Sequence, residues 1–192
     1  MVIAELIETG LLDEQQIPVI NALIQRGTIS PATRIIPTGY RTELQLVTVD
    51  ERMYGHTIRA LRHEWPFYSR GENWTTVPIH DVSDRVTVWQ GQFNDGPHRT
   101  TVQSRLRFTT ANPATVNGLR VCGTAILSAT TELGACDTLN GDKIIPLPPR
   151  TITGPVELDV TYEMGGGLAS LAAQWNAPAE ARSDGTAQLV CQ

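Results

Sequence analysis

The chain has 192 residues, of which 41% are hydrophobic and 18% are charged, and its formal net charge is −5. This length predicts one domain with at most a small appendage, and it excludes a large multidomain enzyme. The basic residues are arginines except for Lys143, and they form no run, which excludes a polybasic tail for nucleic acid or membranes.

The first 27 residues predict a short helical N-terminal arm, followed by a β domain over residues 28–192. Apolar residues recur at three-to-four spacing from Val2, and Gly10 provides a left-handed stop. Pro18 would break a helix begun at Asp13, so the main helix is expected from about Pro18 to Arg26. The arm docks either on its own domain or on a neighbouring subunit. The side chains expected to dock it are Ile3, Leu6, Ile7, Ile20, Leu23 and Ile24.

From Thr42 onward the hydrophobic period changes to two, which predicts half-buried strands. Turn residues such as those at 94–97 and 140–142 separate these runs. The expected strands cover residues 42–49, 73–79, 85–89, 102–108, 118–128, 155–163 and 186–191. The prediction is a mainly β fold, a β-sandwich or jelly-roll-like domain.

Three further segments have less regular patterns, and the first of them fits two conformations. Tyr54, Ile58, Leu61 and Trp65 make a helical stripe, yet residues 47–60 also fit a hairpin that turns near 51–55. Residues 144–150 contain three prolines and predict an exposed, extended connector. Residues 168–175 predict a short helix after three glycines.

The sequence contains no catalytic or ligand-binding motif. The four histidines lack metal-ligand spacing, and the three cysteines lack CxxC spacing, so no metal, no cofactor and reduced thiols are expected. His80 with Asp81 and Asp84 could supply a base and carboxylates, but residues 81–84 are interpreted as a turn that enters the strand at Arg85. A hydrolytic or isomerising enzyme that uses His80 or His98 is kept as a lesser hypothesis, and the chain is expected not to be an enzyme.

Arginines and aromatic residues are concentrated between Arg52 and Phe108. Such side chains fill a core, anchor a protein interface or stack on sugars and bases, and all three interpretations stay open. The candidate binding residues are Arg59, Arg62, Trp65, Tyr68, Arg70, Trp74 and Trp89.

Charge is unevenly distributed along the chain. Residues 51–120 carry an excess of arginine, whereas residues 1–50 and 121–192 carry an excess of acid. Complementary faces of this kind would favour a homo-oligomer, and a solvated surface on which the charges cluster by chance is the alternative. No apolar run is long enough to span a membrane, and Glu5 and Glu8 interrupt the N-terminal apolar residues, so neither a membrane partner nor a signal peptide is expected.

The arm at 2–26, the threonine-rich and lysine-poor β body and the proline-rich segment 145–149 are similar in general make-up to bacteriophage virion structural proteins, namely capsid, decoration and tail or baseplate subunits. This resemblance implies a non-enzymatic subunit of a symmetric assembly, located in a virion assembled in the host cytoplasm. Its partners would be copies of itself and other structural proteins of the assembly. The alternative is a β module that binds glycan or single-stranded nucleic acid through the arginine and aromatic face.

Overall fold

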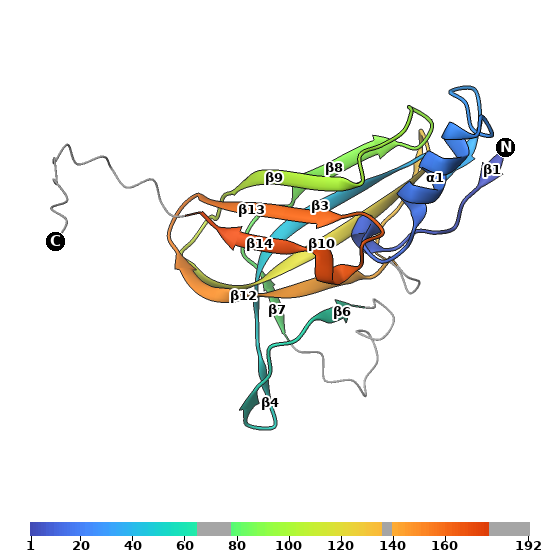
Figure 1. Ribbon diagram of the computed structural model, residues 1–192. Coiled ribbons are helices and arrows are strands. Elements are labelled where there is room, and N and C mark those ends of the chain that lie inside the picture. Colours follow the sequence, from blue (N-terminus) through green and yellow to red (C-terminus); the bar gives the residue numbers. More distant parts are fainter. Residues whose placement is uncertain (65–77, 136–139, 177–192) are drawn as a thin grey trace, which may run out of the picture.

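The computed structural model describes residues 1–64, 78–135 and 140–176. These residues form a mainly β fold in which antiparallel sheets lie in two layers, with a short helix near the N-terminus (Figure 1). The fold class expected from the period-two runs is confirmed. The described strands are β1 (Val2–Ile3), β2 (Ile35–Ile36), β3 (Gly39–Val49), β4 (Arg52–Met53), β5 (His56–Thr57), β6 (Arg62–Glu64), β7 (Ile79–Asp81), β8 (Val86–Gln92), β9 (Thr101–Phe108), β10 (Ala114–Ser128), β11 (Thr131–Leu133), β12 (Asp142–Ile152), β13 (Val156–Glu163) and β14 (Ala172–Trp175).

The larger sheet has the order β6-β12-β10-β3-β7, with β8 also paired to β3 and β11 to β10. In the pairing of β10 with β3, Leu119 is opposite Leu46 and Arg120 is opposite Gln45. Because neighbours in a strand point to opposite faces, the two leucines enter the core between the layers, whereas Arg120 and Gln45 lie on the outer face.

The smaller sheet has the order β14-β13-β9 and covers the other side of the core. On β9, Val102, Leu106 and Phe108 are buried, as the alternation predicts. The intervening Arg105 is exposed and forms a two-pronged ion pair with Asp159 of β13.

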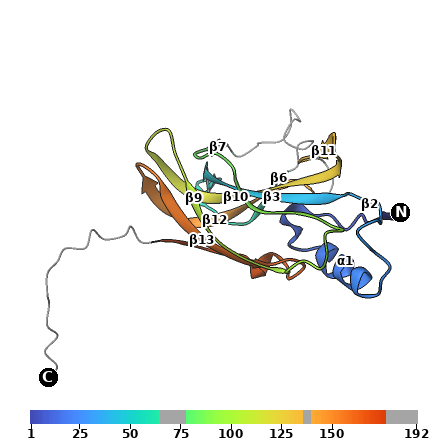
Figure 2. The ribbon, with the colours of Figure 1, turned by 90° about the horizontal axis from the view of Figure 1, so that it is seen from above.

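The N-terminal segment contains one α-helix, α1 (Gln16–Gln25), at the same end of the molecule as the N-terminus (Figure 2). Pro18 lies within the first turn, where its missing N–H costs no helical hydrogen bond, so the helix begins before it rather than at it. Gly27, with φ +72°, follows the helix as expected. Val2 and Ile3 are not helical as predicted but form β1, which pairs in parallel with β2.

The proline-rich segment 144–150 is not an exposed connector, as expected, but part of β12 within the larger sheet. The register with β10 jumps from Pro146 opposite Gly118 to Arg150 opposite Val116, so residues 147–149 bulge from the ladder. Proline is tolerated there because a bulge needs no amide donor.

The structure also decides the conformation of two segments, 52–57 and 168–175. Residues 52–57 form the β4–β5 hairpin rather than a helix, with a turn at Tyr54 and Gly55 (Figure 1). The predicted helix at 168–175 is instead the single 3-10 turn η3 (Leu168–Ser170) followed by β14. The strands expected at 73–79 and 186–191 lie outside the described residues, except for Pro78 and for Ile79, which begins β7. No helix in the described ranges is long and apolar enough to cross a bilayer.

Candidate functional site

A network of charged side chains occupies the outer face of the larger sheet around Arg120 of β10. Arg120 Nη1 lies 2.5 Å from Asp81 Oδ1 and donates to Gln45 Oε1 at 2.9 Å. Arg120 Nε lies 3.2 Å from Glu64 Oε2 and 3.9 Å from Asp142 Oδ2. Strands β7, β3, β6 and β12 therefore each contribute a partner to one guanidinium.

The register of the sheet fixes this network. Gln45 is directly opposite Arg120, and Asp142 is directly opposite Glu64 on the neighbouring strand pair. Opposed residues share a face, so the polar side chains meet on the outer side while the apolar ones enter the core. A second guanidinium, that of Arg85, lies 3.8 Å from Asp142 Oδ2.

Burial decides the protonation behaviour of these groups. It raises the pKa of Asp142 and of Glu64, and the neighbouring guanidinium groups oppose that rise. Burial works against the charge of Arg120, but Glu64 and Asp81 raise its pKa above the ordinary value. Two guanidinium groups thus face three carboxyl groups.

A surface pocket of about 470 Å³ adjoins this network at Asp81. The side chain of Asp81 is 59% exposed, so its carboxylate reaches both Arg120 and solvent. Asp84 is exposed on the same rim. The lining residues are Gln45, Asp81, Val82, Ser83, Asp84, Thr109, Thr110 and Ala111. Two carboxylates among hydroxyl and amide groups suit a cationic ligand that donates several hydrogen bonds, such as a guanidinium; below, this is called the acidic pocket.

Two other pockets differ in chemistry. One, of about 630 Å³, is lined by Asn21, His98, Arg99, Thr100, Thr101 and Gln103. The other is apolar in part, lies near Val49 and Ile144, and has a volume of only about 10 Å³.

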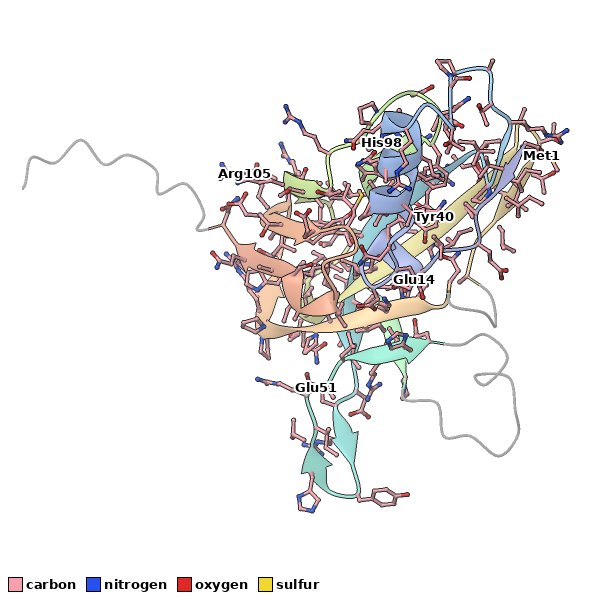
Figure 3. All side chains as sticks on the ribbon, turned by 45° about the vertical axis from the view of Figure 1, so that its right-hand side comes forward. Met1, Glu14, Tyr40, Glu51, His98 and Arg105 are labelled. Carbon is pink, nitrogen blue, oxygen red and sulfur yellow. The ribbon has the colours of Figure 1, made fainter. Side chains whose placement is uncertain are left out.

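On the inner side, Lys143 of β12 fixes the N-terminal segment to the sheet. Its side chain is 0% exposed, and its ammonium forms ion pairs with Glu8 and, at 2.7 Å, with Asp13. Asp13 also accepts a hydrogen bond from Leu168 N, which connects the same segment to the smaller sheet. Figure 3 shows Glu14 and Tyr40 on this side of the molecule. Lys143, Glu8 and Asp13 hold the N-terminal segment against the sheets and are not part of the acidic pocket.

The structure separates the candidate arginine and aromatic residues. Arg59 is paired with Glu51 at 3.0 Å in the hairpin, and Arg62 of β6 donates to the Asp50 carbonyl at 3.3 Å. Trp89 is partly buried, packs against the core and meets His98 edge-on at 5.8 Å. Trp65, Tyr68, Arg70 and Trp74 lie outside the described residues.

The residues expected to dock the arm lie in different environments. Ile20 is buried in the core, and Ile7, Leu23 and Ile24 pack against it. Leu6 is partly buried, whereas Ile3 is 70% exposed. A docking role for these residues stays a prediction.

The histidines show no common site. His80 and Asp81 are adjacent on β7 and point to opposite faces, which separates the base from the carboxylate that the lesser enzyme hypothesis paired. Within residues 1–64, 78–135 and 140–176, no group of histidine, cysteine and acidic side chains could hold a metal ion.

The sequence interpretation missed Arg120 and Glu64, and it took Asp81 and Asp84 for turn residues. An arginine between Leu119 and Val121 in a strand was the available signal. It marks a polar position on an otherwise apolar run, but its partners come from four other strands and cannot be read from spacing.

No protein-family model matches the chain. An uncharacterized protein of Methanocaldococcus jannaschii, MJ1452, is 26% identical over 174 residues, which are 89% of this chain and 59% of the relative. The chain thus spans about three fifths of that curated relative.

Solved structures of protein arginine methyltransferases share the fold. PRMT6 matches over 91% of this chain and 67% of its own, with a TM-score of 0.62 and 10% identity, and a PRMT6 structure with SAH gives 0.57. PRMT1 from Trypanosoma brucei, in an enzyme-prozyme heterotetrameric complex with AdoHcy, matches over 84% of this chain and 58% of its own, with a TM-score of 0.52 and 13% identity.

These neighbours overturn the expected virion structural protein. The resemblance to phage proteins, the non-enzymatic role, the glycan or nucleic-acid alternative and the virion location were wrong, because the chain shares its fold with solved structures of arginine methyltransferases. The virion partners have no support in these comparisons. The reason is physical. Threonine-rich strands and proline-containing bulges occur in many β folds, and they do not identify an assembly.

Proposed function

We propose that this chain acts in the S-adenosylmethionine-dependent methylation of protein arginine residues, as the β domain that recognises the substrate. The observation that carries the proposal is the likeness to arginine methyltransferases over 84 to 91% of the chain. The chain matches 58 to 67% of the length of those proteins, and the proposal concerns the part that it matches.

The described pockets do not fit the methyl donor or its product. Adenine needs a largely apolar, enclosed slot, and a ligand of this size needs several hundred Å³. The two larger pockets are lined mainly by polar side chains, and the partly apolar one holds about 10 Å³. The role proposed for the described residues is therefore recognition of the substrate, with no step of the methyl transfer.

The acidic pocket supports recognition of arginine. Asp84 makes no ion pair within the described ranges, and Asp81 offers its solvent-facing carboxylate oxygen. A guanidinium donates parallel hydrogen bonds to carboxylates, and this charge-assisted geometry distinguishes it from neutral side chains. A substrate arginine would add a positive charge to a network in which carboxyl groups already outnumber guanidinium groups.

A binding experiment tests the recognition. A fluorescent peptide with one central arginine is titrated with the chain, beside the same peptide with neutral citrulline at that position. We expect saturable binding of the arginine peptide, at least tenfold weaker binding of the citrulline peptide, and at least a tenfold loss for Asp84→Asn. Asp95→Asn, an exposed carboxylate in another loop, is the matched control. Equal binding of both peptides contradicts the proposal.

A second experiment tests the methylation itself. The tagged protein is purified under native conditions from cells that express it, and transfer of tritium from labelled S-adenosylmethionine to the arginine peptide is measured. We expect incorporation that Asp84→Asn reduces. Failure of the native preparation to label the peptide refutes the proposed function.

We also propose that the chain associates with other copies of itself. The charge segregation along the sequence favours such contacts. The trypanosomal neighbour is described in a heterotetramer, which shows that a protein of this fold enters oligomers. Sedimentation velocity over a range of concentrations tests this, and a strictly monomeric protein would contradict it.

A further inference from the structure

Arg120 connects the acidic pocket to two carboxyl groups that are not part of the pocket lining. Its Nη1 lies 2.5 Å from Asp81 Oδ1 at the pocket, whereas its Nε lies 3.2 Å from Glu64 Oε2 and 3.9 Å from Asp142 Oδ2. The strands that carry Asp81 and Glu64, β7 and β6, stand at the two ends of the strand order of the larger sheet. One guanidinium on the middle strand therefore contacts both.

A second connection from Arg120 reaches the wall of the pocket through Gln45. Arg120 Nη1 donates to Gln45 Oε1 at 2.9 Å, and Gln45 Nε2 donates to the Ser83 carbonyl at 2.8 Å. The Ser83 hydroxyl accepts a hydrogen bond from Leu46 N at 2.9 Å. Gln45 and Ser83 are buried, so water competes little for these hydrogen bonds. Arg120 thus helps to hold the segment from Asp81 to Ser83 in place beside the pocket.

Glu64 and Asp142 are carboxyl groups whose charge depends on what happens at the pocket. Burial is the main cause that raises the pKa of each group; the charge of Asp81 raises it further, and Arg120 opposes the rise. A ligand that neutralises Asp81 therefore makes both groups lose their protons more readily. Coupling between sites is reciprocal, so loss of those protons strengthens the binding of such a ligand.

The charged groups around these two carboxyl groups come from three parts of the larger sheet. Across the part of the chain that the structure describes, they are Arg120 and Cys122 of β10, Asp81 of β7, and Arg85 beside β8. Burial raises the pKa of the Cys122 thiol, so it stays protonated, and both guanidinium groups stay charged. His63 and His80 are next to Glu64 and Asp81 in their strands, and alternation points them to the opposite face. Glu64 and Asp142 are thus the groups outside the pocket whose charge changes in this network.

We propose that Arg120 couples arginine recognition in the acidic pocket to the protonation of Glu64 and Asp142, so that the pocket binds an arginine side chain more tightly at neutral pH than in mild acid. The inference rests on the arginine recognition proposed above and adds its regulation. In acid, Glu64 and Asp142 carry protons, so Arg120 is left to Asp81 and compensates its charge. As the pH rises, the two ionised carboxylates attract Arg120 and add negative charge, and Asp81 binds the incoming guanidinium more strongly.

Titration of the arginine and citrulline peptides from about pH 5 to about pH 8 tests the coupling. We expect the natural chain to bind the arginine peptide about tenfold more tightly at the upper end, which is a common size for coupling between two sites. Glu64→Gln has a neutral side chain at every pH, so we expect the ratio to fall to about threefold, with Asp142 still titrating. Glu132→Gln is the matched control, because this carboxylate on the same sheet pairs with Arg41 at 3.0 Å instead of with Arg120. It keeps the tenfold ratio.

Proton release on binding is a readout that a merely structural role of Arg120 would not move. Calorimetry of the arginine peptide with the natural chain, in two buffers of different ionisation enthalpy at about pH 6, counts the protons released. We expect a net release from the natural chain and a smaller one from Glu64→Gln, since binding shifts the remaining protons from the buried carboxyl groups. If circular dichroism shows that Glu64→Gln does not fold, Asp142→Asn removes the other carboxyl group and takes its place in both measurements.

The outcomes separate this coupling from the arginine recognition on which it rests. If the arginine peptide is preferred over the citrulline peptide, but with the same pH ratio in the natural chain and the carboxyl variant, the coupling is refuted and the recognition stands. Selective binding without net proton release has the same meaning. Equal binding of the two peptides at every pH refutes the recognition and the coupling together.

Discussion

Replacing Lys143 with methionine removes the ammonium that Glu8 and Asp13 share beneath the N-terminal segment. Methionine keeps the length of the side chain, so the loss of charge is isolated from loss of volume. Breaking a buried ion pair by removing one partner costs about 3 to 5 kcal/mol. Because the Asp13 side chain is 44% exposed and can be hydrated, whereas Glu8 cannot, we expect about 3 kcal/mol.

Urea unfolding followed by circular dichroism measures this loss. The double variant Lys143→Met with Glu8→Gln replaces the stranded carboxylate by a neutral amide, and we expect it to regain part of the stability. The resulting coupling energy belongs to the pair rather than to either residue. If Lys143→Met unfolds with a free energy within 1 kcal/mol of that of the natural chain, the reasoning is refuted. It is also refuted if the loss in the double variant equals the sum of the losses in Lys143→Met and Glu8→Gln.

Two other outcomes follow from the structure. Gly123→Ala would place a Cβ on the Tyr40 hydroxyl, and we expect a loss of about 1 to 3 kcal/mol in the same assay, with Gly134→Ala, whose Cβ meets nothing, as the control. Arg120→Met removes the guanidinium that Asp81, Glu64 and Asp142 share and leaves Asp142 with Arg85 alone. We expect a loss of about 3 kcal/mol at pH 7 that shrinks as acid protonates the carboxylates, and no change with pH would contradict the network.

The parts of the fold that follow local rules could be predicted from the sequence. Alternation along β9 identified Val102, Leu106 and Phe108 as buried, and Gly27 identified the end of α1. Where pairing between distant segments decides the structure, prediction failed. Val2 and Ile3 have helical spacing, but they pair with residues more than thirty positions away.

The candidate site depends almost wholly on such distant pairing. Arg120 and its partners Asp81 and Glu64 are each separated by tens of residues, and only the register of the sheet brings them together. The single lysine was visible in the sequence, at the start of an apolar run, yet nothing local indicated that Glu8 would cover it. The prediction of function from composition was wrong, because composition depends on the secondary structure of the chain and carries no information on the chemistry of a site.

The bulge in β12 has a consequence for behaviour at high concentration. Exposed strand margins are templates for edge-to-edge pairing between molecules, the first step of aggregation. Pro148 and Pro149 are consecutive, and neither has a backbone N–H. Because successive backbone amides of a strand point to opposite margins, one hydrogen-bond donor is absent from each margin of β12. The proline pair therefore leaves fewer backbone donors with which a strand of another molecule could pair along this stretch of β12.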